Sequence, residues 1–129
     1  MREKGGAIVN MASIASMIPS PPIAAYGFGK AGVERFTRTV ALHCAQAAYR
    51  IRCNSVHPGQ IRTPMLDGLF AKAADYGGTS DDMRLAFLSR IPQGCFGTPE
   101  DIACGVLYLV SDESRHLTGR RLSLTAAWT

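Results

Sequence analysis

Three short strand-like runs and one long periodic segment dominate the hydrophobic pattern of the chain. Residues 7–12 are apolar without alternation, which is typical of a strand covered on both faces of a sheet. Residues 51–56 and 121–125 are two further short strand candidates. Residues 24–47 place apolar side chains at steps of three and four, which predicts one long helix. Its predicted buried stripe consists of Val33, Phe36, Val40 and Cys44.

The second half of the chain adds helices to this pattern. Residues 65–74 and 81–90 are helix candidates on either side of a glycine turn. Thr98 followed by Pro99 and two acidic residues predicts a helix start, and that helix extends to about residue 111. Its predicted buried residues are Ile102, Val106, Leu109 and Val110. A strand, a long helix and a second strand form a βαβ unit, so we predict an α/β fold with about three parallel strands and flanking helices.

Composition and charge narrow the class of protein. The chain has 129 residues with 47% hydrophobic and 19% charged side chains, which is ordinary for one small globular domain. The basic residues behind the net charge of +4 are scattered, apart from a short cluster at Arg115, Arg120 and Arg121, and no aromatics are interleaved with them, so we expect no nucleic-acid partner. No apolar run is long enough to cross a membrane. The four cysteines lack C-x-x-C spacing, which favours reduced thiols in a cytoplasmic protein over a disulfide frame or a metal site.

The candidate chemistry lies at the ends of the first two predicted strands. Ser13 follows the first strand, and Tyr26 and Lys30 lie four residues apart at the start of the long helix, so they share a face. A nearby cation favours the phenolate form of a tyrosine, which can then exchange a proton with an alcohol or ketone. The loop 58–64 follows the second strand, and ligands of open parallel sheets bind beyond the carboxyl ends of the strands.

Two features of this region allow two interpretations. The segment 65–96 directly follows the candidate site and is long for a connection, which favours a substrate loop or lid; the alternative is a packed helical unit without a gating role. Gly27, Gly29 and Gly32 each lower helix propensity by about 1 kcal/mol relative to alanine. They indicate either a close approach by a backbone or ligand, or a helix-packing face of small residues.

A lone Tyr-x-x-x-Lys pair occurs often by chance, and an exposed lysine beside a packed tyrosine would explain it. The combination with a serine at one strand end and a Pro-Gly loop at the next is much more specific. Residues 8–13, 25–31, 51–64 and 108–119 resemble, in chain order, four motif regions of the short-chain dehydrogenases/reductases. The resemblance extends over essentially the whole chain. A weaker similarity over 41–52 and 56–58 favours members that act on hydroxysteroids and alicyclic alcohols.

The resemblance implies the C-terminal part of a doubly wound, Rossmann-like parallel sheet and an enzyme that interconverts alcohols and ketones. Tyr26 would be the general acid/base, and Lys30 would favour its phenolate form and bind the nicotinamide ribose. Ser13 would hydrogen-bond and orient the substrate oxygen. Hydride transfer would use NAD or NADP, with NAD slightly favoured.

The same resemblance assigns the nicotinamide side of the site to the loop after the second strand. Pro58, Gly59, Ile61 and Thr63 would line it, together with Tyr26 and Lys30. Backbone groups and the Thr63 hydroxyl would hold the carboxamide and diphosphate region of the cofactor. The resemblance also implies a small-molecule alcohol or ketone as substrate and a homotetrameric full-length parent protein.

The chain departs from the family in lacking a counterpart of its N-terminal half. Gly27-x-Gly29-x-x-Gly32 spells a dinucleotide motif, but it lies inside the predicted long helix and not at a strand-to-helix turn, so we assign it no phosphate. We expect residues 1–129 to be a single partial domain, truncated and inactive as this chain alone. The alternative is a non-catalytic fragment or interaction subunit that retains the family's association surfaces on the long helix and on the final helix and strand.

Overall fold

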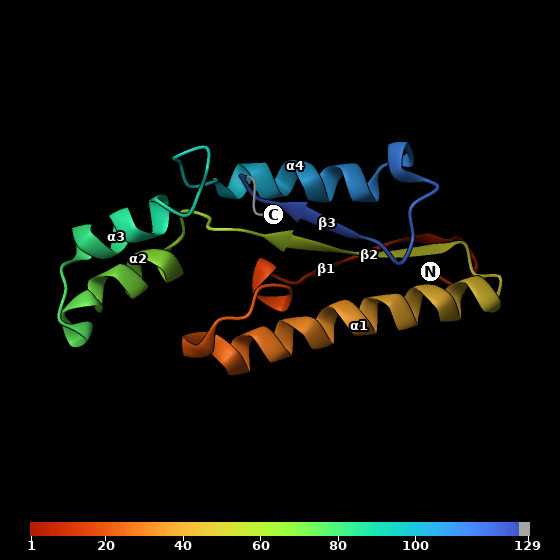
Figure 1. The fold of residues 1–129 in the computed structure, drawn as a ribbon. Helices are drawn as coiled ribbons and strands as arrows, with labels where there is room; N and C mark the ends of the chain where they lie inside the picture. Colours follow the sequence, from red (N-terminus) through yellow and green to blue (C-terminus); the bar gives the residue numbers. More distant parts are fainter. Residues whose placement is uncertain (127–129) are drawn as a thin grey trace.

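A computed structural model describes residues 1–126 of the chain as a three-stranded parallel sheet with helices on both faces (Figure 1). The strand order is β1-β2-β3, with β2 in the centre. This confirms the predicted α/β fold, and β1 and β2 are joined by the predicted long helix. The elements, in chain order, are β1 (Gly6–Met11), η1 (Ile14–Ser16), η2 (Pro21–Ile23), α1 (Ala24–Gln46), β2 (Ile51–Pro58), α2 (Pro64–Ala71), η3 (Ala73–Tyr76), α3 (Ser80–Leu88), α4 (Pro99–Val110), η4 (Asp112–Ser114) and β3 (Arg121–Leu124).

The central strand β2 forms the core of the sheet. Met11 of β1 pairs with Val56, and Pro58 at the end of β2 pairs with Leu124 of β3. The five consecutive side chains from Cys53 to His57 are all buried, because α1 covers one face of the sheet and α4 covers the other (Figure 1). The carboxyl ends of the three strands therefore share one edge, and that edge carries the candidate site.

The fully buried residues of helix α1 share only Cys44 with the predicted stripe. Thr37, Ala41 and Cys44 are its buried residues, whereas Phe36 is 64% exposed, so the prediction was wrong for Phe36. The reason is a polar contact from the sheet: the Asn10 amide donates a 2.9 Å hydrogen bond to Thr37 Oγ1, which in turn donates to the carbonyl of Val33. This contact turns the Thr37 face of the helix toward β1.

Helix α4 begins as its sequence predicts. The Thr98 hydroxyl accepts from the backbone N–H of Asp101 at 3.3 Å, and the Asp101 carboxylate accepts from the N–H of Thr98 at 2.7 Å, which together form a capping box. Ile102 and Leu109 are buried as expected. Val110 was expected to be buried as well, but it is 46% exposed because it lies on the outer side of the last turn.

The segment between β2 and α4 has a small hydrophobic core of its own. The Phe70 ring packs edge-on against Phe87, with 5.5 Å between ring centroids, and at a tilt against Phe96, with 5.9 Å between centroids. Ile91 is buried in the same cluster. Figure 1 shows α2 and α3 side by side beyond the carboxyl ends of the strands. The segment is thus a packed helical unit, and its action as a substrate loop stays a prediction.

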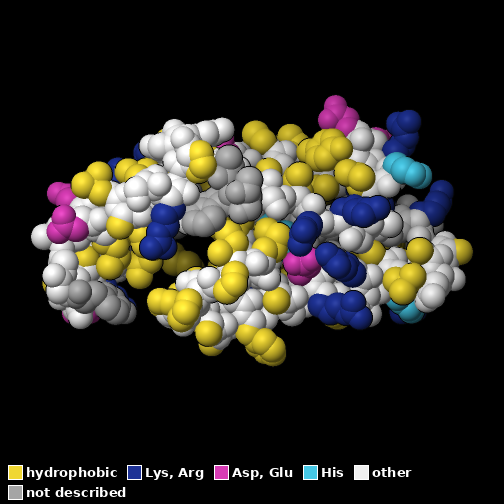
Figure 2. All heavy atoms as spheres, in the orientation of Figure 1, with side chains coloured by type: hydrophobic (Ala, Val, Ile, Leu, Met, Phe, Trp, Pro, Cys, Tyr) yellow, Lys and Arg dark blue, Asp and Glu magenta, His cyan; other side chains and the backbone are white. Residues whose placement is uncertain are grey.

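The surface in Figure 2 is uneven in character. Hydrophobic side chains gather over the first turns of α1, where Phe28 is 83% exposed. Basic side chains gather between α1 and β3, around Arg38 and Arg121, with the Glu34 carboxylate paired to both. Among the described residues, no helix combines the length and apolar character needed to span a bilayer.

Candidate active site

Ser13 lies where β1 ends and the chain turns away from the sheet. The backbone N–H of Ala12 still donates to Val56 of β2 at 2.9 Å, and Ser13 then has an extended backbone that begins η1. The Ser13 hydroxyl caps this turn by accepting a hydrogen bond from the N–H of Ala15 at 3.1 Å. That bond uses one acceptor site of the hydroxyl, so its proton can still donate to a ligand.

Tyr26 and Lys30 lie on the first two turns of α1, on the face predicted from their spacing. The Lys30 ammonium lies over the Tyr26 ring, 5.6 Å from the ring centroid. It donates a 3.0 Å hydrogen bond to the carbonyl of Met11, the last residue of β1. Tyr26 is 42% exposed, so its ring is accessible to a ligand. The Lys30 bond therefore holds the pair at the end of β1, two residues before Ser13.

Gly27 brings the Ser13 turn and the Tyr26 helix into direct contact. A Cβ at residue 27 would lie 2.8 Å from the carbonyl oxygen of Ala15, which is closer than side-chain carbons come to other atoms. A Cβ at residue 29 or 32 would meet no described atom within 4 Å. Close approach of another backbone therefore explains Gly27. For Gly29 and Gly32, the described residues support neither close approach nor a helix-packing face.

The predicted cofactor-side loop leaves β2 at the same edge of the sheet. Pro58 is the last residue of β2, and Gly59 donates from its N–H to the carbonyl of Leu124 at 3.0 Å. Ile61 forms an isolated parallel bridge with Gly97. The Thr63 hydroxyl caps α2 by accepting from the N–H of Leu66 at 3.4 Å, so its own proton can still donate. Backbone bonds to the neighbouring segments thus fix the course of the loop.

One side-chain acceptor in this loop has no partner. The Oε1 atom of Gln60 is buried and makes no hydrogen bond to any residue that the structure describes. A buried acceptor without a partner costs about 1–3 kcal/mol, so a ligand N–H that reached it would be stabilised there. This atom was not among the sequence-predicted site residues.

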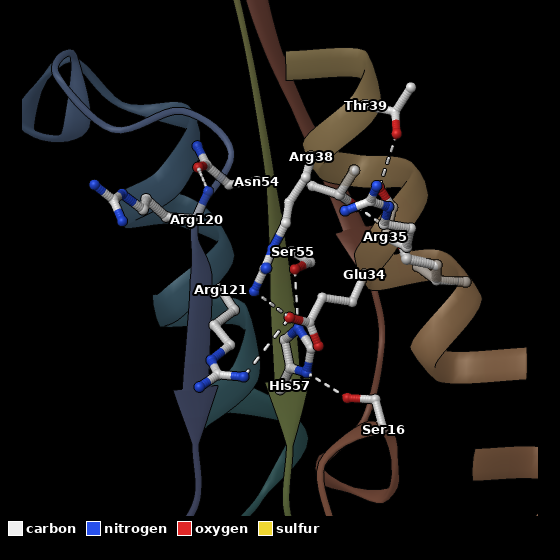
Figure 3. Close-up of polar contacts among 12 residues, drawn as sticks. Ser16, Glu34, Arg35, Arg38, Thr39, Asn54, Ser55, His57, Arg120 and Arg121 are labelled. Carbon is white, nitrogen blue, oxygen red and sulfur yellow. Dashed lines mark hydrogen bonds and ion pairs between the residues drawn. The ribbon is translucent and has the colours of Figure 1, made fainter. Parts of the chain in front are cut away.

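His57 connects the two strand ends, and the sequence interpretation gave it no role in the site. Its ring is fully buried, with Nε2 2.9 Å from Ser55 Oγ and Nδ1 3.0 Å from Ser16 Oγ (Figure 3). Nδ1 also lies 3.2 Å from the carbonyl oxygen of Ser13. Burial lowers the pKa of the imidazole below its usual value of 6.5 and outweighs the opposing effects of the Ser13 carbonyl and the Glu34 carboxylate. The available signal was the period of two in β2, which places Ser55 and His57 on one face of a buried strand where polar groups need partners.

The described residues therefore bring Ser13, Tyr26 and Lys30 to one strand end and place the loop from Pro58 to Thr63 at the neighbouring one. A phenol, an ammonium and a hydroxyl at the mouth of a parallel sheet can exchange a proton with a bound oxygen and hold that oxygen in place. Among the described residues, no group of three or more His, Cys, Asp or Glu side chains has the arrangement of a metal site. All four cysteines are free thiols.

Comparison with known proteins places the chain among dehydrogenases and reductases. A family model described as enoyl-(acyl carrier protein) reductase matches residues 1–126. A 3-beta-hydroxysteroid dehydrogenase of Comamonas testosteroni is 42% identical over 122 residues, and the match covers 95% of this chain and 46% of that protein. An NADP-dependent (R)-specific alcohol dehydrogenase of Lentilactobacillus kefiri is 36% identical over 125 residues, covering 97% and 46%.

Solved structures give the same result at the level of the fold. The crystal structure of an NAD⁺-bound xylitol dehydrogenase superposes with a TM-score of 0.85 at 27% identity, over 95% of this chain and 48% of that one. This chain spans less than half the length of the proteins that it matches. The names of these proteins include both NAD and NADP, so they do not distinguish between the two cofactors.

Proposed function

Because the chain belongs to the short-chain dehydrogenase/reductase family, we propose that it carries the proton-transfer part of an NAD(P)-dependent oxidoreductase that interconverts a secondary alcohol and a ketone. The observation that supports this most directly is the position of Lys30, whose ammonium lies over the Tyr26 ring and bonds the strand end next to Ser13. In the oxidative direction the Tyr26 phenolate accepts the alcohol proton. In the reductive direction the phenol donates a proton to the carbonyl oxygen.

Ser13 orients the reacting oxygen in this proposal. Its hydroxyl proton is not used by the bond from Ala15, so it can donate to the substrate oxygen while the backbone turn holds the serine. The residues present fit the nicotinamide end of the cofactor. Lys30 donates one of its three protons to the Met11 carbonyl, so the other two can donate to ribose hydroxyls. The buried Oε1 of Gln60 can accept a hydrogen bond from the carboxamide N–H.

The loop from Pro58 to Thr63 would hold the same end of the cofactor. Gly59 and Ile61 are fixed by backbone bonds, and the Thr63 hydroxyl can still donate to the carboxamide or diphosphate region. When bound, a nicotinamide cofactor supplies or accepts the hydride. Residues 65–96 would form the substrate loop, as a packed helical unit at the mouth of the site. The similarity to a 3-beta-hydroxysteroid dehydrogenase supports a hydroxysteroid or alicyclic alcohol as the substrate class.

The test uses the intact protein in which this chain occurs. Cyclohexanone and a 3-ketosteroid are offered with NADH or NADPH, and cofactor oxidation is followed by absorbance. We expect turnover, and we expect Tyr26→Phe to lower kcat by about 10²–10⁴-fold because it removes the proton donor, while cofactor binding stays largely intact. Tyr108→Phe, on α4, is the matched control and should turn over normally. Absence of turnover in the unmodified protein, or full activity of Tyr26→Phe, would refute the proposal.

Association with further copies of the chain is a second candidate role. Exposed apolar side chains on the outer faces of α1 and α4 support it, among them Phe36, Leu42 and Leu107. Sedimentation of the intact protein distinguishes the two roles, since an oligomer that binds neither NADH nor NADPH would favour an interaction subunit. A homotetrameric state and a cytoplasmic location stay predictions.

A further inference from the structure

The imidazole of His57 is enclosed at the carboxyl end of β2 between two serine hydroxyls and one carbonyl. Ser55, on its own strand, faces Nε2, while Ser16 and the Ser13 carbonyl face Nδ1 from the neighbouring turn η1. The charged groups that act on the ring are Glu34 and Arg38 on α1 and Arg121 on β3, and the Glu34 carboxylate pairs with both arginines (Figure 3). The His57 side chain is fully buried, so contact with solvent does not account for a polar residue at this position.

The hydrogen bonds determine which nitrogen carries the proton. The Ser16 hydroxyl donates to the Ser13 carbonyl at 2.7 Å, so its proton is already used. The Ser13 carbonyl oxygen can only accept a hydrogen bond, and Nδ1 lies 3.2 Å from it, so we assign the ring proton to Nδ1, from which the Ser16 hydroxyl can also accept. Nε2 then accepts from the Ser55 hydroxyl. The ring is neutral in this arrangement, which agrees with its burial.

We propose that His57 is a positioning residue for Ser13, which it holds by donating from Nδ1 to the Ser13 carbonyl and to the Ser16 hydroxyl that bonds the same carbonyl. The backbone of Ser13 sets the position from which its side chain extends, and the hydroxyl receives only one bond, from Ala15, among the described residues. The link ties the end of β1 to the end of β2 at the level of the site. Its catalytic consequence rests on the proposed function, whereas its effect on the Ser13 turn does not.

Two variants of the intact protein separate positioning from simple packing. The amide nitrogen of asparagine can replace Nδ1, so His57→Asn keeps a donor toward Ser13 and loses the partner of Ser55. Glutamine reaches the position of Nε2, so His57→Gln keeps the Ser55 partner and more of the buried volume but loses the donor toward Ser13. If His57 only packs, Ala15 protection and kcat should be higher in the glutamine variant. If His57 positions Ser13, both should be higher in the asparagine variant.

The first measurement is amide hydrogen exchange at Ala15, whose N–H bonds the Ser13 hydroxyl. We expect its protection to be retained in His57→Asn and to fall in His57→Gln, relative to the exchange of core amides in the same variant. The second measurement is turnover of cyclohexanone or the 3-ketosteroid. We expect kcat to fall by about tenfold to a hundredfold in His57→Gln, with KM nearly unchanged, and to recover in His57→Asn, because small displacements of a positioning group cost up to about 10²-fold in rate.

The outcomes are distinct. If Ala15 protection and kcat are both higher in His57→Gln than in His57→Asn, in line with the stability of the two variants, then His57 only fills the core and the proposal is overturned. If the unmodified protein turns over neither substrate, the proposed function fails, and Ala15 exchange alone decides whether His57 holds the Ser13 turn. Equal Ala15 protection in both variants and the unmodified protein also overturns the proposal.

Discussion

The Lys30 ammonium donates a 3.0 Å hydrogen bond to the Met11 carbonyl, and this bond joins the start of α1 to the end of β1. The same ammonium lies over the Tyr26 ring. A lysine side chain has several rotatable bonds, and the strand end restricts them by accepting one of its three protons. Lys30 is thus held beside Tyr26 before any ligand arrives, and its other two protons can bind a ligand.

Lys30→Met should weaken cofactor binding and turnover together. Methionine keeps an unbranched side chain but removes both the charge and the donors. Hydrogen bonds to charged groups contribute about 1.5–3 kcal/mol, so we expect the Kd for NADH and NADPH to rise by roughly ten- to a hundredfold. Fluorescence titration of the intact protein measures the change. Lys4→Met, at an exposed lysine outside the site, is the control, and cofactor affinity equal to that of the control would contradict the assigned role.

Alanine at residue 27 and alanine at residue 32 should have opposite effects on stability. A Cβ at residue 27 would lie 2.8 Å from the Ala15 carbonyl oxygen, so Gly27→Ala must push the Ser13 turn away from α1, and we expect about 1–3 kcal/mol of destabilisation. A Cβ at residue 32 has no neighbour among the described atoms, so Gly32→Ala should stabilise the helix by about 1 kcal/mol. Urea unfolding of the intact protein measures both.

Activity provides the second readout for this pair. Gly27→Ala should lower kcat at saturating cofactor, since it displaces the turn that carries Ser13, whereas Gly32→Ala should leave kcat unchanged. Two variants of equal stability would show that α1 and η1 are not held in contact at Gly27 in solution.

Local features of the fold could be predicted from the sequence because they depend on neighbouring residues. The start of α4 follows from Thr98 and Asp101, three residues apart, and the structure confirms it with a capping box. The pairing of Tyr26 with Lys30 follows from one helical turn. In both cases the spacing alone fixes the geometry once a helix forms.

Contacts between distant residues were not predictable in the same way. His57 and the Ser13 carbonyl are 44 residues apart, and their contact depends on the register of β1 against β2. The exposure of Phe36 had a similar cause, since the Asn10 amide on β1 selects Thr37 as the inward-facing residue of α1. Sequence periodicity gives the width of a helical face, but a polar partner on the sheet can rotate that face by one position.

Arg52→Met should destabilise the fold from a position outside the site. The guanidinium of Arg52 on β2 donates to the carbonyl of Leu109 at 2.8 Å and to that of Ser111 at 3.1 Å, at the carboxyl end of α4. Cations at this end of a helix are favourable, and the carbonyls would lose a charged donor, so we expect a loss of about 1.5–3 kcal/mol. Urea unfolding measures it. Arg50→Met removes only an exposed 3.3 Å bond to the Glu3 carbonyl and should cost less than about 0.5 kcal/mol; an equal loss would contradict the role of Arg52.

Stability should fall as the pH is lowered through 6.5, and His57 should cause part of that fall. Burial lowers the pKa of its imidazole in the folded protein below the usual 6.5, so near and below that pH the unfolded chain binds the proton more readily than the folded one does. The free energy of unfolding therefore rises with pH across this window, by at most about 1.4 kcal/mol per pH unit for one group, and levels off above it. Asparagine cannot titrate, so His57→Asn should flatten the slope.

The carboxylates change stability in a separate and more acidic window. Hydrogen bonds from the hydroxyl and then the backbone N–H of Thr79 lower the pKa of Asp82, and those from the backbone N–H and then the hydroxyl of Thr98 lower the pKa of Asp101, both below the usual 3.8. Their contributions are present above 3.8 and are lost as the pH falls through the lowered values. Urea unfolding of the intact protein and of His57→Asn at a series of pH values separates the two windows. An identical slope for both proteins between neutral pH and about pH 5 would mean that His57 is not buried as a neutral imidazole.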